Sequence, residues 1–151
     1  MTPAPLPELV ELLRLDGIKA FSTRRGAEAT LGDPYSGFSI CSYTGDSWLH
    51  TDGCLQSLAR LTGIEARDII MPGQTHSVRC VVIGPDGNDS GLPDLNGVDA
   101  LVTRRRHTVI GINTADCLPL VMADPVARVI AVAHAGWRGQ WEAWWKIPSG
   151  P

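Results

Sequence analysis

The sequence predicts an α+β fold, a sandwich of mixed β-sheets flanked by helices. Two observations favour this class: apolar residues at helical spacing occur only in the first half of the chain, and strand-like apolar runs follow one another in the second half. The length of 151 residues and the hydrophobic fraction of 44% suit one globular domain with a core of its own. We therefore expect residues 1–151 to form a single domain.

The first half is expected to contain two amphipathic helices and two strands. In residues 6–15 leucine and valine recur at helical spacing, with Pro7 suited to a first turn and Gly17 to a stop. A second helix is indicated by apolar residues within 55–61 and is closed by Gly63. Two further runs are typical of short strands: 18–23 and 68–71.

The second half is denser in strands. Apolar and β-branched residues dominate five runs, which we expect to be strands: 78–83, 99–103, 108–113, 118–123 and 129–134. Because continuous apolar runs suit strands that are covered on both faces, we expect these strands to be buried. The polar stretch 84–97 is expected to be one long surface loop, and the arginines 104–106 a solvated turn between two strands.

Composition and charge exclude several classes of function. Sixteen acidic against thirteen basic residues give a net charge of -3, which argues against nucleic acid as a partner. The sequence has neither a signal segment nor a run of about 18 apolar residues, so we expect a cytoplasmic protein with no membrane partner. The four cysteines form no C-x-x-C pair, and Cys41, Cys54 and Cys80 are expected to be small buried residues.

Three residues with metal-ligand chemistry stand at or beside the ends of strand-like runs: His76, Cys117 and His134. Strand ends and the loops after them are where a rigid scaffold presents reactive groups. Two imidazoles and one thiolate are a complete ligand set for a catalytic zinc, which takes three protein ligands and leaves one position open. The ligands are 41 and 17 residues apart, and this spacing alone is a weak signal, because such a trio is more often structural.

The sequence motifs around these residues resemble those of a known family. Four blocks carry the resemblance: Gln-Thr-His-Ser at 74–77, Asp-Ala-Leu-Val-Thr at 99–103, Thr-Ala-Asp-Cys-Leu-Pro at 114–119 and His-Ala-Gly-Trp-Arg-Gly at 134–139. They are similar to the signature blocks of the family long labelled multicopper polyphenol oxidase or laccase-like, whose members are now regarded as purine nucleoside phosphorylases with adenosine deaminase activity. The resemblance runs from about Phe21 to Gly139.

The resemblance implies a zinc ion held by His76, Cys117 and His134. It also implies the α+β sandwich and a reaction in which adenosine, inosine or guanosine and phosphate give the free base and ribose 1-phosphate, with adenosine deaminase activity beside it. Zinc suits deamination because it lowers the pKa of a bound water towards about 7. The implied partners are small molecules, a purine nucleoside and phosphate. The oligomeric state is left open.

Further side chains are candidates for the chemistry. Arginine pairs with two phosphate oxygens at once, so three arginines are candidates for phosphate binding: Arg24, Arg25 and Arg138. Asp116 directly precedes a ligand and is expected either to shuttle a proton or to hydrogen-bond a ligand histidine. Gln74 and Tyr43 are expected either to contact the base or to be structural.

Two alternatives remain open beside the zinc enzyme. A copper-dependent polyphenol oxidase with several coppers needs about three donors per copper, whereas the chain has four histidines, of which His50 and His107 are expected to be solvated. A non-catalytic zinc-binding remnant would hold a structural metal and recruit a fourth ligand, such as Cys80 or His107.

The end of the sequence departs from the resemblance. Four tryptophans fall within residues 137–151. Family members continue well past the His-Ala-Gly-Trp-Arg-Gly block that ends at Gly139, usually with a threonine where this chain has Gln140. Restoring one nucleotide near the Gly139 codon would let the neighbouring frame continue the family pattern. We therefore expect a truncated or frameshifted member, a partial domain that is incomplete at the C-terminus, with an exposed strand edge, poor solubility and little activity.

Overall fold

The chain divides into two compact units, Met1–Ile69 and Ile70–Pro151, in a computed structural model that describes residues 4–27, 29–84 and 91–136. The expected incompleteness at the C-terminus concerns residues 137–151, which lie outside the described part. None of the helices in the described part of the chain has the length and apolar character needed to span a bilayer.

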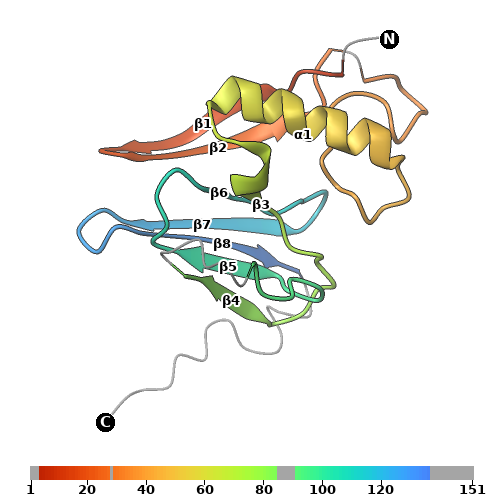
Figure 1. Cartoon of the computed structure of the whole chain (residues 1–151). Helices are drawn as coiled ribbons and strands as arrows, with labels where there is room; N and C mark the ends of the chain where they lie inside the picture. Colours follow the sequence, from red (N-terminus) through yellow and green to blue (C-terminus); the bar gives the residue numbers. More distant parts are fainter. Residues whose placement is uncertain (1–3, 28, 85–90, 137–151) are drawn as a thin grey trace. The chain divides into compact units, whose positions relative to one another are not determined.

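The first unit begins with an antiparallel hairpin of β1 (Glu8–Leu15) and β2 (Ile18–Arg24) (Figure 1). The helix expected over residues 6–15 is therefore wrong. A register shift lies between Glu11 and Leu13, so the half-buried residues of β1 are Val10, Leu13 and Leu15. This bulge gives the apolar residues a spacing of three, which imitates a helical period.

Helix α1 (Trp48–Thr62) follows, where the second helix was expected, and a short 3-10 helix, η1 (Ala66–Asp68), comes after it. Ser47 caps α1 by accepting a hydrogen bond from the His50 amide, and Gly63 ends it in the left-handed conformation. The expectation that His50 is solvated is wrong, because its half-buried ring lies between Asp46, 2.6 Å from Nδ1, and the buried Cys54, 3.7 Å from Nε2.

The second unit is built on a four-stranded mixed sheet in the order β4-β5-β8-β7. Strand β4 (Cys80–Ile83) runs parallel to β5 (Ala100–Thr103), and β8 (Val129–Ala135) is antiparallel to both β5 and β7 (Leu118–Asp124). Two short strands, β3 (Ile69–Ile70) and β6 (Val109–Ile110), form a separate pair. The strands expected in this half are all present and the mixed pairing is confirmed.

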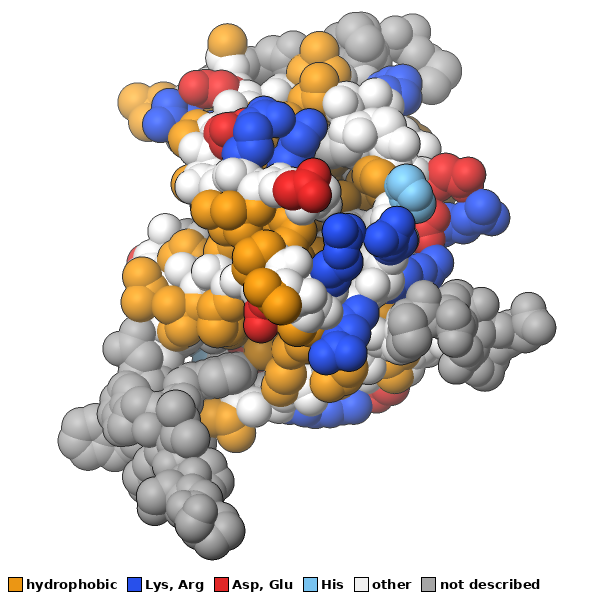
Figure 2. All heavy atoms as spheres, turned by 90° about the vertical axis from the view of Figure 1, so that its left-hand side faces the viewer, with side chains coloured by type: hydrophobic (Ala, Val, Ile, Leu, Met, Phe, Trp, Pro, Cys, Tyr) orange, Lys and Arg blue, Asp and Glu red, His pale blue; other side chains and the backbone are white. Residues whose placement is uncertain are grey.

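One face of the sheet packs on the apolar core of the second unit. The core consists of six buried residues from the strands and the segments between them: Ile70, Ile83, Val98, Leu101, Ile110 and Val132. The expectation that every strand is covered on both faces holds for the central strand β8 but is wrong for β7, along which no residue is fully buried. It is also wrong for β4, where Val82 is exposed and where Cys80, expected to be buried, is exposed as well. Within the described residues, β7 is an edge strand with a neighbour on one side only. Figure 2 shows hydrophobic side chains on the face that carries the β7–β8 turn.

We expect the loss of unfolding free energy on truncating a valine to alanine to depend on whether that valine is buried in this core. Val98→Ala takes two methyl groups from a side chain with no solvent exposure and should lower the free energy of unfolding by about 2 kcal/mol. Val126→Ala is the matched control, since Val126 is 93% exposed in the β7–β8 turn, and it should change stability by no more than about 0.5 kcal/mol. Urea unfolding of both variants measures the difference, and equal losses would contradict the assignment of the core.

Candidate metal centre

The sheet register brings two of the expected ligands together. In the antiparallel pair of β7 and β8, Pro119 lies opposite His134 and Leu118 opposite Ala135. Cys117 directly precedes β7, so its side chain lies beside the end of β8. His76 comes from a third segment, the loop between β3 and β4. All three residues belong to the second unit.

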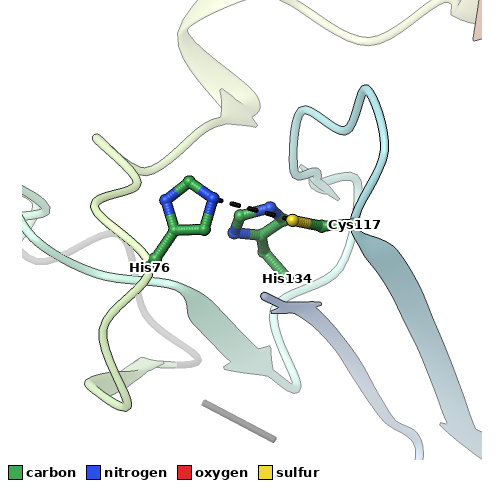
Figure 3. Close-up of side chains that lie close together, drawn as sticks. All are labelled: His76, Cys117 and His134. Carbon is green, nitrogen blue, oxygen red and sulfur yellow. Dashed lines mark hydrogen bonds between the residues drawn. The ribbon is translucent and has the colours of Figure 1, made fainter. Parts of the chain in front are cut away.

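The three side chains meet at one point (Figure 3). Their ligand atoms all lie within 4.8 Å of one another, and Cys117 Sγ is 3.6 Å from His76 Nε2. A sulfur and a nitrogen on one tetrahedral zinc would lie about 3.5 Å apart, given Zn–S of about 2.3 Å and Zn–N of about 2.0–2.1 Å. The donor types and the S–N distance therefore fit a single zinc ion.

The trio has a buried side and an open side. His134 is 5% exposed, Cys117 is half-buried and His76 is exposed. Among the described residues, the group has three potential ligands, and neither of the possible fourth ligands, Cys80 and His107, belongs to it. Three ligands with one exposed side are compatible with a further ligand from solvent or substrate.

A buried carboxylate, that of Asp99, lies behind two of the ligands. Its Oδ1 accepts hydrogen bonds from the His76 amide at 3.0 Å and from His134 Nδ1 at 2.8 Å. Its Oδ2 accepts from the amides of Thr75 at 3.0 Å and Ser77 at 2.9 Å. Asp99, rather than Asp116, is thus the carboxylate that contacts a ligand histidine.

These hydrogen bonds also set the ionisation of Asp99. Burial by itself raises the pKa of the carboxyl, but the hydrogen bonds from His134, Thr75 and Ser77 outweigh it and hold the pKa below its ordinary value. The group is therefore ionised at neutral pH. Because the folded pKa is the lower one, the stabilisation is present above the ordinary aspartate pKa of about 3.9 and is lost as the pH falls through the folded value.

Gln74 joins the loop of His76 to the segment that leads to Cys117. Its side-chain Nε2 donates to the Asn113 carbonyl at 2.8 Å, and its Oε1 accepts from the Asn113 amide at 2.6 Å. Both ends of the amide are thereby engaged with the backbone. Of the two roles expected for Gln74, these contacts support the structural one.

Gly136, just after β8, makes room for the ring of His76. A Cβ at Gly136 would lie 2.6 Å from His76 Cδ2, a distance that real atoms do not tolerate. The rings of His76 and His134 meet edge to face, with centroids 4.8 Å apart. The absence of a side chain at Gly136 therefore allows the two imidazoles to face the same point.

The other residues that were expected to take part in the chemistry are found in both units of the chain. Asp116 is exposed, with Oδ1 3.7 Å from Cys117 Sγ. In the first unit, Arg24 pairs with Glu8 at 3.1 Å, and Arg25 donates to backbone carbonyls of its own loop, including that of Asp33 at 2.9 Å. Tyr43 is also in the first unit, and Arg138 lies outside the described residues.

Sequence reasoning missed Asp99 and Gly136 as functional residues, although both stand in the signature blocks. The signal for Asp99 was available: it is an acidic residue directly before a buried apolar run. An acidic residue at that place needs a partner inside the fold, because a buried charge without one is costly.

A family described as multi-copper polyphenol oxidoreductase laccase matches residues 18–145. The chain belongs to this family. The resemblance deduced from the four signature blocks is thereby confirmed.

The family includes enzymes named for nucleoside chemistry. Adenosine deaminase RL5, from an unknown prokaryotic organism, is 43% identical over 141 residues, which are 87% of this chain and 53% of that protein. The purine nucleoside phosphorylase of Deinococcus radiodurans is 36% identical over 139 residues, 92% of this chain and 51% of the relative. Purine nucleoside phosphorylase ORF3 of Streptomyces griseus is 35% identical over 118 residues, 78% and 46% of the two chains. The chain spans about half the length of these relatives.

Two solved structures share the fold. A protein from Neisseria meningitidis is 26% identical with a TM-score of 0.68, over 87% of this chain and 51% of that one. The hypothetical protein YfiH from Bacillus licheniformis is 23% identical with a TM-score of 0.69, over 80% and 46%. These matches confirm the predicted α+β class with mixed sheets.

The close approach at Gly136 generates a prediction about metal binding. Gly136→Ala should displace the His76 ring and weaken zinc binding by about 10-fold or more, the range found when groups around metal ligands are altered. Gly53→Ala, in helix α1 of the first unit, controls for an added methyl group. Competition with a chromogenic chelator measures both affinities. Unchanged zinc affinity in a folded Gly136→Ala protein would contradict the tight packing of Gly136 against His76.

Proposed function

We propose that this protein is a zinc-dependent purine nucleoside phosphorylase. In this reaction adenosine, inosine or guanosine and phosphate give the free base and ribose 1-phosphate. We propose an adenosine deaminase activity at the same site. The names of the relatives support the substrate class, and the site geometry supports a metal enzyme. The expectation of a cytoplasmic location remains part of this proposal.

One observation carries the proposal: His76, Cys117 and His134 place three ligand atoms within 4.8 Å of one another with His76 exposed to solvent. We assign these three residues as the zinc ligands. When bound, zinc supplies Lewis-acid polarisation of water or of a substrate oxygen. The chain's part is to hold the three donors in position and to keep one side of the site accessible.

Phosphorolysis breaks the bond between ribose C1′ and the base nitrogen and forms a bond between C1′ and a phosphate oxygen, while the base leaves with a proton. Asp116 is exposed beside Cys117 and is suited to move that proton. For phosphate we propose Arg24 and Arg138. Arg24 is exposed and pairs with the exposed Glu8, which is a weak contact that phosphate can replace. Arg25 is a weaker candidate because its guanidinium already holds its own loop.

Two other functions remain as outcomes of the tests. The description of the family favours copper-dependent polyphenol oxidation, and two histidines with one cysteine can also bind copper. A site for several coppers needs more donors than this trio supplies, and among the described residues the trio is the one group of its kind. The third possibility is a non-catalytic zinc-binding remnant, which would bind the metal and turn over nothing.

Metal analysis tests the ligand assignment. The purified protein should hold about one zinc ion per chain, and Cys117→Ser should lower that content at least 10-fold because the thiolate ligand is gone. Cys80→Ser is the matched control, since Cys80 is an exposed thiol outside the trio and its loss should leave the zinc content unchanged. Several coppers and no zinc would overturn the assignment.

An assay of base release with and without phosphate tests the reaction. Inosine should give hypoxanthine and ribose 1-phosphate only when phosphate is present, and adenosine should also give inosine by deamination. Asp116→Asn should slow base release by about 10²-fold or more with little change in zinc content, because a positioned proton donor contributes about that much. Rapid oxidation of phenols without base release would favour the oxidase, and zinc binding without either reaction would favour the remnant.

A further inference from the structure

We propose that Asp99 is the positioning residue that pre-forms the zinc site, because its one carboxylate fixes the ring of His134 and the backbone of the His76 loop before any metal binds. This inference rests on the proposed zinc ligands but not on the reaction. It assigns a role to a side chain that is itself no ligand in the trio.

The Asp99 carboxylate has no solvent exposure and meets four donors. Each of its oxygens receives two hydrogen bonds, at 2.8–3.0 Å, from three consecutive backbone amides and one imidazole nitrogen. Two oxygens offer about four lone-pair positions, so the acceptor capacity of the carboxylate is filled. No water is needed to satisfy it.

The contact with Asp99 selects the tautomer of the His134 ring. A carboxylate can only accept hydrogen bonds, so the nitrogen 2.8 Å away, Nδ1, must carry a proton. In the neutral imidazole the other nitrogen, Nε2, then keeps its lone pair, which is the form that binds a metal. The backbone is held as well, because the His134 amide donates to the Asp99 carbonyl at 2.8 Å.

The contacts with the His76 loop fix an unfavourable backbone. His76 has φ of 59°, in the left-handed region that non-glycine residues rarely adopt. This conformation turns the amides of Thr75, His76 and Ser77 towards a single point, as in the concave backbone arrangements that bind anions. The anion here is the Asp99 side chain. These hydrogen bonds offset the cost of the left-handed residue.

The amide of asparagine cannot replace this carboxylate in either orientation. With its NH₂ at the Oδ2 position, two donors would face the amides of Thr75 and Ser77. With its NH₂ at the Oδ1 position, that NH₂ would face the His76 amide, another donor, and it could bond to His134 only by donating to Nδ1, which moves the ring proton to Nε2. That form lacks the lone pair that zinc requires.

The first experiment uses the metal-free wild-type protein. Long-range ¹H–¹⁵N correlation spectra report which nitrogen of each histidine carries the proton, and assignment by comparison with His134→Gln identifies the signal. We expect His134 to be protonated at Nδ1 and unprotonated at Nε2 without any metal. A ring protonated at Nε2, or an equal mixture of the two forms, would overturn the proposal.

The second experiment measures zinc affinity in Asp99→Asn. A loss of about 10- to 100-fold is expected, together with a shift of the His134 proton to Nε2 and a changed absorption spectrum with Co²⁺. Asp124→Asn is the matched control: Asp124 accepts the amides of Val126 and Ala127 in the β7–β8 turn, and its loss should change zinc affinity by less than about twofold.

The outcomes separate this inference from the proposed function. A folded Asp99→Asn protein, checked by circular dichroism, that binds zinc as wild type does would overturn it. If Asp99→Asn does not fold, the position of the His134 ring proton in the metal-free wild-type protein still tests the proposal. If the wild-type protein releases no base, the proposed reaction fails while the ring form and the zinc affinities still test Asp99.

Discussion

The Asp99 carboxylate, shielded from solvent, lies where the loop carrying His76 meets the end of strand β8. Burying a charge is costly unless hydrogen bonds replace its lost hydration, and here four donors do so. The same four contacts define the backbone of one ligand loop and the ring of another ligand. Folding of this part of the second unit and formation of the ligand set are therefore one event, because the carboxylate is satisfied only when both segments are in place.

The sheet supplies what the carboxylate cannot. Ala100 lies opposite Ala133 in β5 and β8, and Pro119 lies opposite His134 in β7 and β8. This register places Asp99 and Cys117 on either side of His134, one strand away in each direction. A shift by one residue would turn His134 to the other face of the sheet. Burial of β5 and β8 side chains in the core thus fixes the register of the strands, and this register keeps His134 beside Asp99 and Cys117.

Much of the second unit could be predicted from its sequence, because its apolar runs are bounded by polar turns and every expected strand is present. The extent of burial could not, since Leu118–Asp124 is as apolar as the central strands and its place at the edge depends on pairing between distant segments. The helix expected over residues 6–15 failed for a local reason. The Asp16–Gly17 pair is a strong hairpin signal, and a bulge near Leu12 disguised the strand period.

The ligands and their supports differ in how far the sequence can reveal them. His76, Cys117 and His134 could be singled out because they combine metal-ligand chemistry with signature blocks that resemble a known family, whereas their spacing alone left structural roles open. Asp99, Gln74 and Gly136 act through hydrogen bonds to backbone atoms or through the space they leave, and those depend on segments 20 to 60 residues away. The donor set also bears on the choice of metal. Among the described residues, one buried imidazole fixed by a carboxylate, one exposed imidazole and one thiolate are donors enough for one ion, so the proposed centre is mononuclear and differs from the multi-copper chemistry in the family's description.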